Sequence, residues 1–150
     1  MSTTTEEKTK VKAKNKHKVK DIGVDAGLIL IADLDFWLEL EKSYKLKLNE
    51  SRDQNLEQIV QLPKGLKKIK WSIKNTWNGS IEGIDELNIT SGSVMIGDPC
   101  YLFADQNDWI IFLEKFELFD RRKTVKRPFV LINSMGGDGC YTLDLSVLKQ

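Results

Sequence analysis

The sequence has few of the residues from which most catalytic and metal sites are built. It contains one histidine and two cysteines, and the histidine, His17, lies in a lysine-rich N-terminal segment. Cys100 and Cys140 belong to no CxxC pair, so a structural zinc site is not indicated. A reactive cysteine needs a cationic neighbour, which the position of His17 does not supply to a folded domain. We therefore interpret Cys100 as a structural residue and expect no cofactor and no metal.

Several sequence motifs are also missing. There is no phosphate-binding Walker loop, no GxGxxG after a strand, no GxSxG and no HExxH. No apolar run approaches the ~18 residues of a membrane helix, and the N-terminus lacks the apolar core of a secretory signal. These absences favour a cytoplasmic protein with no membrane partner that is not an enzyme.

The positive charge is concentrated at the N-terminus, although the whole chain has a net charge of +1. Residues 1–20 hold seven lysines against two glutamates, and these lysines occupy every second position from 8 to 20. Only Val11 and Val19 could be buried if this segment formed a strand, which is too little to offset its ordering entropy. We interpret residues 1–21 as a disordered basic tail, either solubilising or polyanion-binding, and residues 22–150 as a single domain.

Two blocks of sequence recur in the same order. Residues 26–37 (AGLILIADLDFW) match residues 91–102 (SGSVMIGDPCYL), and residues 71–81 match residues 129–139. In the first match, Asp33 corresponds to Asp98. The order of the blocks predicts an internal duplication, with halves at about 24–86 and 89–145.

Each half has the pattern strand, turn, helix, strand, turn, strand. Short apolar runs are typical of strands buried on both faces, and apolar residues at helical spacing predict helices that pack on a core. Asp35 is a candidate cap for the first helix, and Asn107 or Asp108 for the second. We predict an α+β fold, a mostly antiparallel sheet or small barrel with two helices, arranged by a pseudo-twofold duplication. The expected strands include 28–31, 69–73, 94–96, 129–132 and 141–145, the expected helices include 37–44 and 109–116, and 49–61 is expected to be a surface connection or marginal helix.

One pattern in the second half resembles that of small uncharacterised bacterial and bacteriophage proteins. Its residues are Gly92-x-x-x-Ile96-x-Asp98-Pro99-Cys100-Tyr101, then Trp109, then Gly137-Asp138-Gly139-x-Tyr141. No activity is established for that group. The resemblance implies a compact fold, a phage or mobile-element origin, and a place in the cytoplasm of a bacterial host or in a virion.

Asp98 has two alternative interpretations. An aspartate that closes a strand can accept backbone N–H groups in an Asx-turn, and Pro99 fixes the φ angle of the next residue. Asp33 would then have the equivalent role in the first half. Alternatively, Asp98 and Asp138 could converge on a divalent metal in a small metal-dependent hydrolase.

Basic residues gather beside two predicted strands. A strand over 69–73 places Ile69, Trp71 and Ile73 inward, which leaves its lysines on the outward face. We predict a non-enzymatic interaction protein that binds nucleic acid, or a protein partner, through these patches and the tail. The alternative is a structural, virion-type protein-binding subunit; in either case the oligomeric state stays open. The candidate binding residues are Lys68, Lys70, Lys74, Arg121, Arg122, Lys126 and Arg127.

Overall fold

The computed structural model describes residues 15–25, 27–46, 58–75, 79–122, 127–134 and 139–148. For Tyr44, Gln58 and residues 116–122 only the backbone is described. Predictions that fall on residues 1–14, on Lys126 and on Asp138 lie outside the described residues.

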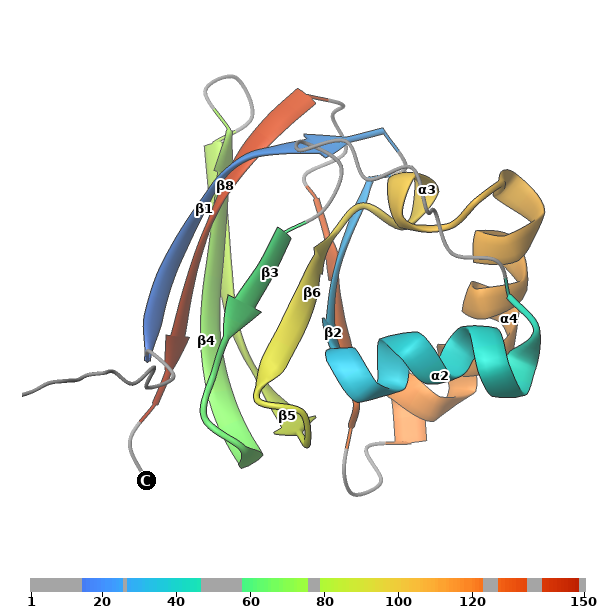
Figure 1. The fold of residues 1–150 in the computed structure, drawn as a ribbon. Helices are drawn as coiled ribbons and strands as arrows, with labels where there is room; N and C mark the ends of the chain where they lie inside the picture. Colours follow the sequence, from blue (N-terminus) through green and yellow to red (C-terminus); the bar gives the residue numbers. More distant parts are fainter. Residues whose placement is uncertain are drawn as a thin grey trace, which may run out of the picture.

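The described residues form two antiparallel sheets and a layer of helices (Figure 1). The outer sheet has the strand order β1-β8-β4-β5, and the inner sheet has the order β3-β6-β2-β7. The helices cover the face of the inner sheet that points away from the outer sheet. The outer sheet consists of β1 (Lys16–Val24), β8 (Gly139–Val147), β4 (Gly65–Asn75) and β5 (Gly79–Ile89), the inner sheet of β3 (Gln58–Gln61), β6 (Ser93–Gly97), β2 (Leu28–Asp33) and β7 (Phe129–Asn133), and the helices are α2 (Leu34–Tyr44), α3 (Pro99–Leu102) and α4 (Gln106–Arg122).

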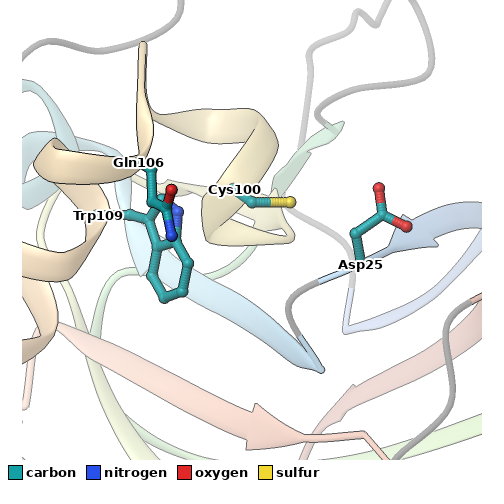
Figure 2. A pocket seen from close by; sticks show the side chains of 4 residues that line it. All are labelled: Asp25, Cys100, Gln106 and Trp109. Atoms are coloured by element: carbon teal, nitrogen blue, oxygen red, sulfur yellow. The ribbon is translucent and has the colours of Figure 1, made fainter.

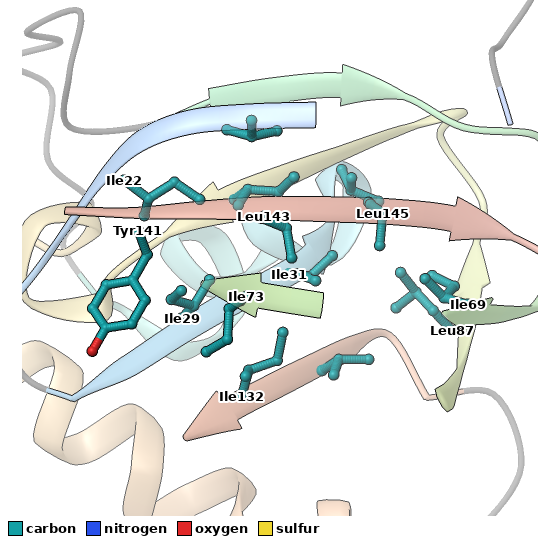
Figure 3. Packing of buried hydrophobic residues seen from close by; sticks show 14 of the residues in the cluster. Ile22, Ile29, Ile31, Ile69, Ile73, Leu87, Ile132, Tyr141, Leu143 and Leu145 are labelled. Carbon is teal, nitrogen blue, oxygen red and sulfur yellow. The ribbon is translucent and has the colours of Figure 1, made fainter. Parts of the chain in front are cut away.

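Strand β2 is buried on both faces, as its continuous apolar run predicts. Ile29 and Ile31 belong to the core between the two sheets, whereas Leu30 and Ala32 belong to the core between the inner sheet and the helices. Figure 3 shows Ile29 and Ile31 among side chains of the outer sheet. Alternate residues of β2 therefore point to opposite faces of the inner sheet, and both faces are covered. Strand β2 thus lies at the centre of a three-layer fold.

Aromatic rings fill the space between the inner sheet and the helices. The ring of Phe112 lies 5.4 Å from that of Phe129 and 5.3 Å from that of Phe103, and Trp37 lies 5.0 Å from Phe103, between centroids. These separations are typical of packed aromatic pairs. The helical stripes that contain Trp37 and Phe112 are therefore core, as predicted.

The predicted α+β class is confirmed, but two elements differ from their predictions. Residues 16–21, predicted to lie in a disordered tail, are part of β1, because β8 supplies backbone partners and because Val19, Ile22 and Val24 are buried in the core. Residues 58–61 are strand β3, which pairs with β6, and are not a surface connection or helix. In both places, pairing with a distant strand outweighs a weak local signal.

The helix starts also differ from their predictions. Asp105, and not Asn107 or Asp108, caps α4, since its Oδ1 accepts the backbone N–H of Asp108 at 3.2 Å. Asp33 precedes α2 and occupies its cap position, which places the predicted cap Asp35 inside the first turn. Each helix thus begins earlier than the sequence pattern predicts.

The internal duplication is not confirmed. The two sheets do have a symmetric strand order: if β1 is exchanged with β5, β2 with β6, β3 with β7 and β4 with β8, each sheet keeps the same order, read from its other edge. However, the second sequence match aligns β4 with β7, and these strands lie in different sheets. The duplication, with the halves derived from that match, stays a prediction.

Candidate functional site

A buried aspartate follows β6 at the start of α3. Asp98 is 0% exposed, its Oδ1 accepts the backbone N–H of Cys100 at 2.9 Å, and its Oδ2 accepts the backbone N–H of Asp25 at 2.7 Å. Pro99 occupies the first turn of α3, where its missing N–H costs nothing. The turn interpretation of Asp98 is therefore confirmed, and its carboxylate also holds the β1–β2 turn.

A second buried aspartate ends β2. Asp33 is 2% exposed and accepts hydrogen bonds from the backbone N–H groups of Thr90 and Ser91, each at 3.1 Å. The hydroxyls of Thr90 and Ser91 donate to the same carboxylate at 2.7 and 2.8 Å. Asp33 does not cap α2 through its side chain, and instead holds the β5–β6 turn. The two aspartates thus have equivalent places but different partners.

Beside Asp98 the chain forms a surface pocket of about 290 Å³, which Figure 2 shows. Asp25 from the β1–β2 turn, Cys100 from α3, and Gln106 and Trp109 from α4 line it. The Tyr101 hydroxyl donates a hydrogen bond to the Asp25 carboxylate. Gln106 and Trp109 line the same side of the pocket, and the Cys100 sulfur points across toward Asp25 (Figure 2).

The hydrogen bond to Asp25 is the main cause that raises the pKa of Tyr101 from 10.0 to about 12, followed by desolvation and by the charge of Asp25. Subtracting the absorbance titration of the Tyr101→Phe variant from that of the parent protein isolates the ionisation of Tyr101. We expect this difference curve to have a midpoint near pH 12. Asp25→Asn should lower this midpoint toward 10, because the acceptor loses its charge. Because the folded-state pKa is the higher one, the contribution to stability is present below pH ~10 and is lost as the pH rises through ~12. A midpoint near 10 in the parent protein would contradict this hydrogen bond.

The metal interpretation has no support in the described residues, and Asp138 lies outside them. In that part of the chain, no three His, Cys, Asp or Glu side chains are placed to hold a metal ion. Neither Cys100, which is partly buried, nor Cys140, which is exposed, forms a disulfide.

The outward side of the outer sheet carries two rows of exposed lysines. Lys68, Lys70 and Lys74 lie on β4, as predicted, and β1 adds Lys16, Lys18 and Lys20. Strand β8 runs between the two rows, so that Ser146 pairs with both Lys16 and Lys70. We call these six lysines the lysine face. The alternate lysines of β1 have the period of a strand, to which we gave less weight in the sequence than to the small number of residues that this segment could bury.

Among the cationic residues predicted beside β7, Arg127 is the one whose side chain is described, and it does not extend the lysine face. The Nη1 of Arg127 lies 3.4 Å from Asp85 Oδ1, and Asp85 Oδ2 accepts the indole N–H of Trp71 at 2.8 Å. Arg127 therefore links the start of β7 to Asp85, which belongs to the inward-facing residues of the outer sheet. Arg121 and Arg122 belong to the last turn of α4, without described side chains, and Lys126 is outside the described residues.

Comparisons with known protein families, with curated proteins and with solved structures give no match. The resemblance to bacterial and bacteriophage proteins therefore stays a prediction. Among the described helices, none combines the length and the apolar character that crossing a membrane requires.

Proposed function

We propose that the protein binds a linear polyanion, with single-stranded nucleic acid as the class, along the lysine face. The observation that carries the proposal is the pair of lysine rows on β1 and β4 with β8 between them. Neighbouring strands are ~4.8 Å apart, so the two rows flank a strip roughly 10 Å wide. The strip itself carries the short side chains Thr142, Asp144 and Ser146 of β8, of which Asp144 is negatively charged. Long cationic side chains on both sides of short polar ones suit an extended phosphate backbone.

The spacing along the strands supports the same ligand. Alternate residues of a strand are roughly 6.6 Å apart, which is comparable to the separation of successive phosphates in an extended single strand. Lys16 and Lys18 have this spacing on β1, as do Lys68 and Lys70 on β4, whereas Lys20 lies where the register of β1 shifts between Val19 and Ile22. A ligand that lies along β8 meets Lys16 and Lys70 on its two sides at Ser146, whereas at Asp144 it meets Lys18 on the β1 side and Ser72 on the β4 side.

The composition of the outward face favours binding without base recognition. Among its described residues there is no aromatic ring on which a base could stack. Strand β5 presents Glu82 and Glu86 on the side beyond β4, which directs an anion toward β8. Binding through phosphates alone is sequence-tolerant and strongly dependent on salt.

Replacing Lys68, Lys70 and Lys74 by Gln should weaken binding of a fluorescein-labelled 20-residue oligothymidylate about tenfold or more. Each phosphate that is no longer neutralised should also reduce the slope of log affinity against log salt by about 0.7, and three such phosphates should reduce it by about 2. Fluorescence anisotropy of the full-length protein over a salt series measures both quantities. The matched control replaces Lys42, Lys45 and Lys115, exposed lysines of the helical layer, and should keep affinity and slope near those of the parent.

A gain-of-affinity variant tests the strip itself. Asp144 lies on β8 within the strip, with its Oδ1 4.0 Å from Lys18 Nζ. Asp144→Asn removes a negative charge and frees Lys18, so binding should tighten several-fold.

Replacing Lys8, Lys10, Lys12 and Lys14 by Gln in the full chain distinguishes binding by the tail from binding by the lysine face. Loss of all binding in that variant would confine binding to the tail, and unaltered binding in the β4 variant would exclude the lysine face, so either result would refute the proposal. No binding by the parent protein at low salt would favour a protein partner.

A further inference from the structure

Asp33 and Asp98 each end a strand and bind a turn from another part of the chain. These two junctions differ in one respect that concerns the pocket. Thr90 contacts Asp33 through its backbone N–H and through its hydroxyl, whose oxygen lies 2.7 Å from a carboxylate oxygen of Asp33 and 2.7 Å from one of Asp35, so that its single proton is shared between them. Asp25 contacts Asp98 only through its backbone N–H. Its carboxylate extends away from the junction, to the Tyr101 hydroxyl. The Asp33 junction is thus closed by its own hydroxyl groups, whereas the other presents an exposed carboxylate beside a pocket.

The pocket exists because the chain after Asp98 takes a longer path than the chain after Asp33. Asp33 leads directly into α2, but Asp98 leads into the short helix α3, and α4 begins only at Gln106. This path brings Trp109 and Gln106 to the wall that faces Asp25 (Figure 2). Trp109 is partly buried, with its buried part against the core of the helical layer. Trp109 therefore both packs against this core and lines the pocket.

The pocket carries negative charge. In the described part of the chain, the Asp25 carboxylate is hydrogen-bonded by the neutral Tyr101 hydroxyl and forms no ion pair with a lysine or arginine. Buried Asp98 lies directly behind it, bonded to the Asp25 backbone. Two hydrogen bonds, one to the backbone and one to the side chain, fix the position of Asp25, so that a ligand would not have to order it.

We propose that this pocket binds a compact organic cation, an ammonium or guanidinium group, between the Asp25 carboxylate and the Trp109 ring. A carboxylate and an aromatic face are the two groups that attract such a cation, the first by charge and the second by its quadrupole. The Gln106 side-chain oxygen supplies a further acceptor on the same wall. A volume of about 290 Å³ accommodates a guanidinium with its methylene chain. The cation could belong to a free amine or to an Arg or Lys side chain of a partner, and the proposal does not depend on the lysine face.

The test is a titration of the full-length ¹⁵N-labelled protein with N-acetyl-arginine amide and with N-acetyl-citrulline amide, its uncharged analogue. The Trp109 indole resonance, assigned by Trp109→Phe, reports binding by a saturable shift. We expect arginine amide to produce this shift and citrulline amide to bind at least tenfold more weakly. Equal binding of the two compounds, or no shift at millimolar concentrations of either, would overturn the proposal.

Variants and a second ligand complete the test. Asp25→Asn should weaken arginine amide binding about tenfold, while Glu41→Gln, which removes an exposed carboxylate of α2 outside the lining of the pocket, should leave it unchanged. An equal effect of both variants would show general charge attraction and refute a site. Agmatine and a five-residue peptide with one central arginine then identify the source: equal binding indicates a free amine, and tighter binding of the peptide indicates a protein partner.

Discussion

Asp33→Ala is expected to destabilise the protein by about 3–5 kcal/mol. Asp33 is 2% exposed, and its two oxygens accept four hydrogen bonds from Thr90 and Ser91. Alanine would leave two backbone N–H groups without their acceptor, and each such group costs about 1–3 kcal/mol when it stays out of water. The hydroxyls of Thr90 and Ser91 would lose one acceptor each, but Asp35 and the Ser93 carbonyl stay within 2.7 and 2.8 Å of them. Local rearrangement and water entry reduce the sum to the stated range. Urea unfolding monitored by far-UV circular dichroism measures the difference.

Two variants serve as controls for this prediction. Asp33→Asn keeps one carbonyl acceptor and the shape of the side chain, so its loss should be smaller than that of the alanine variant. Asp35→Ala removes a neighbouring carboxylate that accepts only the Thr90 hydroxyl, and should cost less than about 1 kcal/mol. If Asp33→Ala costs no more than Asp35→Ala, the β5–β6 turn does not depend on the buried carboxylate.

The central strands were predictable from sequence because their burial leaves a clear pattern. The runs in β2 and β6 are apolar at consecutive positions, as expected of strands with a sheet on one side and helices on the other. Strand β4 alternates, because only its inward face is buried. In these elements the local sequence and the tertiary environment favour the same structure.

Strand β1 was not predicted, although its sequence has period 2. Its lysines at 16, 18 and 20 gave the segment the composition of a disordered tail, and Val19 alone could not argue for burial. What fixes the strand is β8, more than 100 residues later, which pairs with it from Lys16 to Val24. Composition describes a segment in isolation, whereas a strand at the edge of a sheet is stabilised by its neighbour.

The candidate sites also combine contacts that local sequence predicts with contacts that depend on the fold. The Asp98 turn follows from local sequence, since the carboxylate, Pro99 and the Cys100 N–H are adjacent in the chain. The contact between Asp25 and Tyr101 spans 76 positions. It exists because the β1–β2 turn lies against the end of β6, which is a consequence of strand order. No spacing rule could have joined these two residues.

Ile31→Ala is expected to destabilise the protein by about 2–5 kcal/mol, the range for removing three methylene-sized groups from a closed core. Ile31 is 0% exposed and belongs to β2, between β6 and β7. Ile96 and Val130 are its pairing partners, and its side chain faces the outer sheet, as Figure 3 shows. Because β2 is held by strands on both sides and covered on both faces, the backbone has little freedom to close the cavity. Chemical unfolding, with the m-value compared between variants, measures the loss.

Ile59→Ala is the matched control, since it makes the same substitution in the same inner sheet. Ile59 lies on the edge strand β3 and is 50% exposed, so it should cost below about 1 kcal/mol. The two residues have the same side chain and β propensity, so a difference between the two losses isolates burial between the layers. Equal losses would mean that the space between the sheets is not a closed core. The fold would then have to be maintained by backbone pairing and by the aromatic cluster beneath the helices.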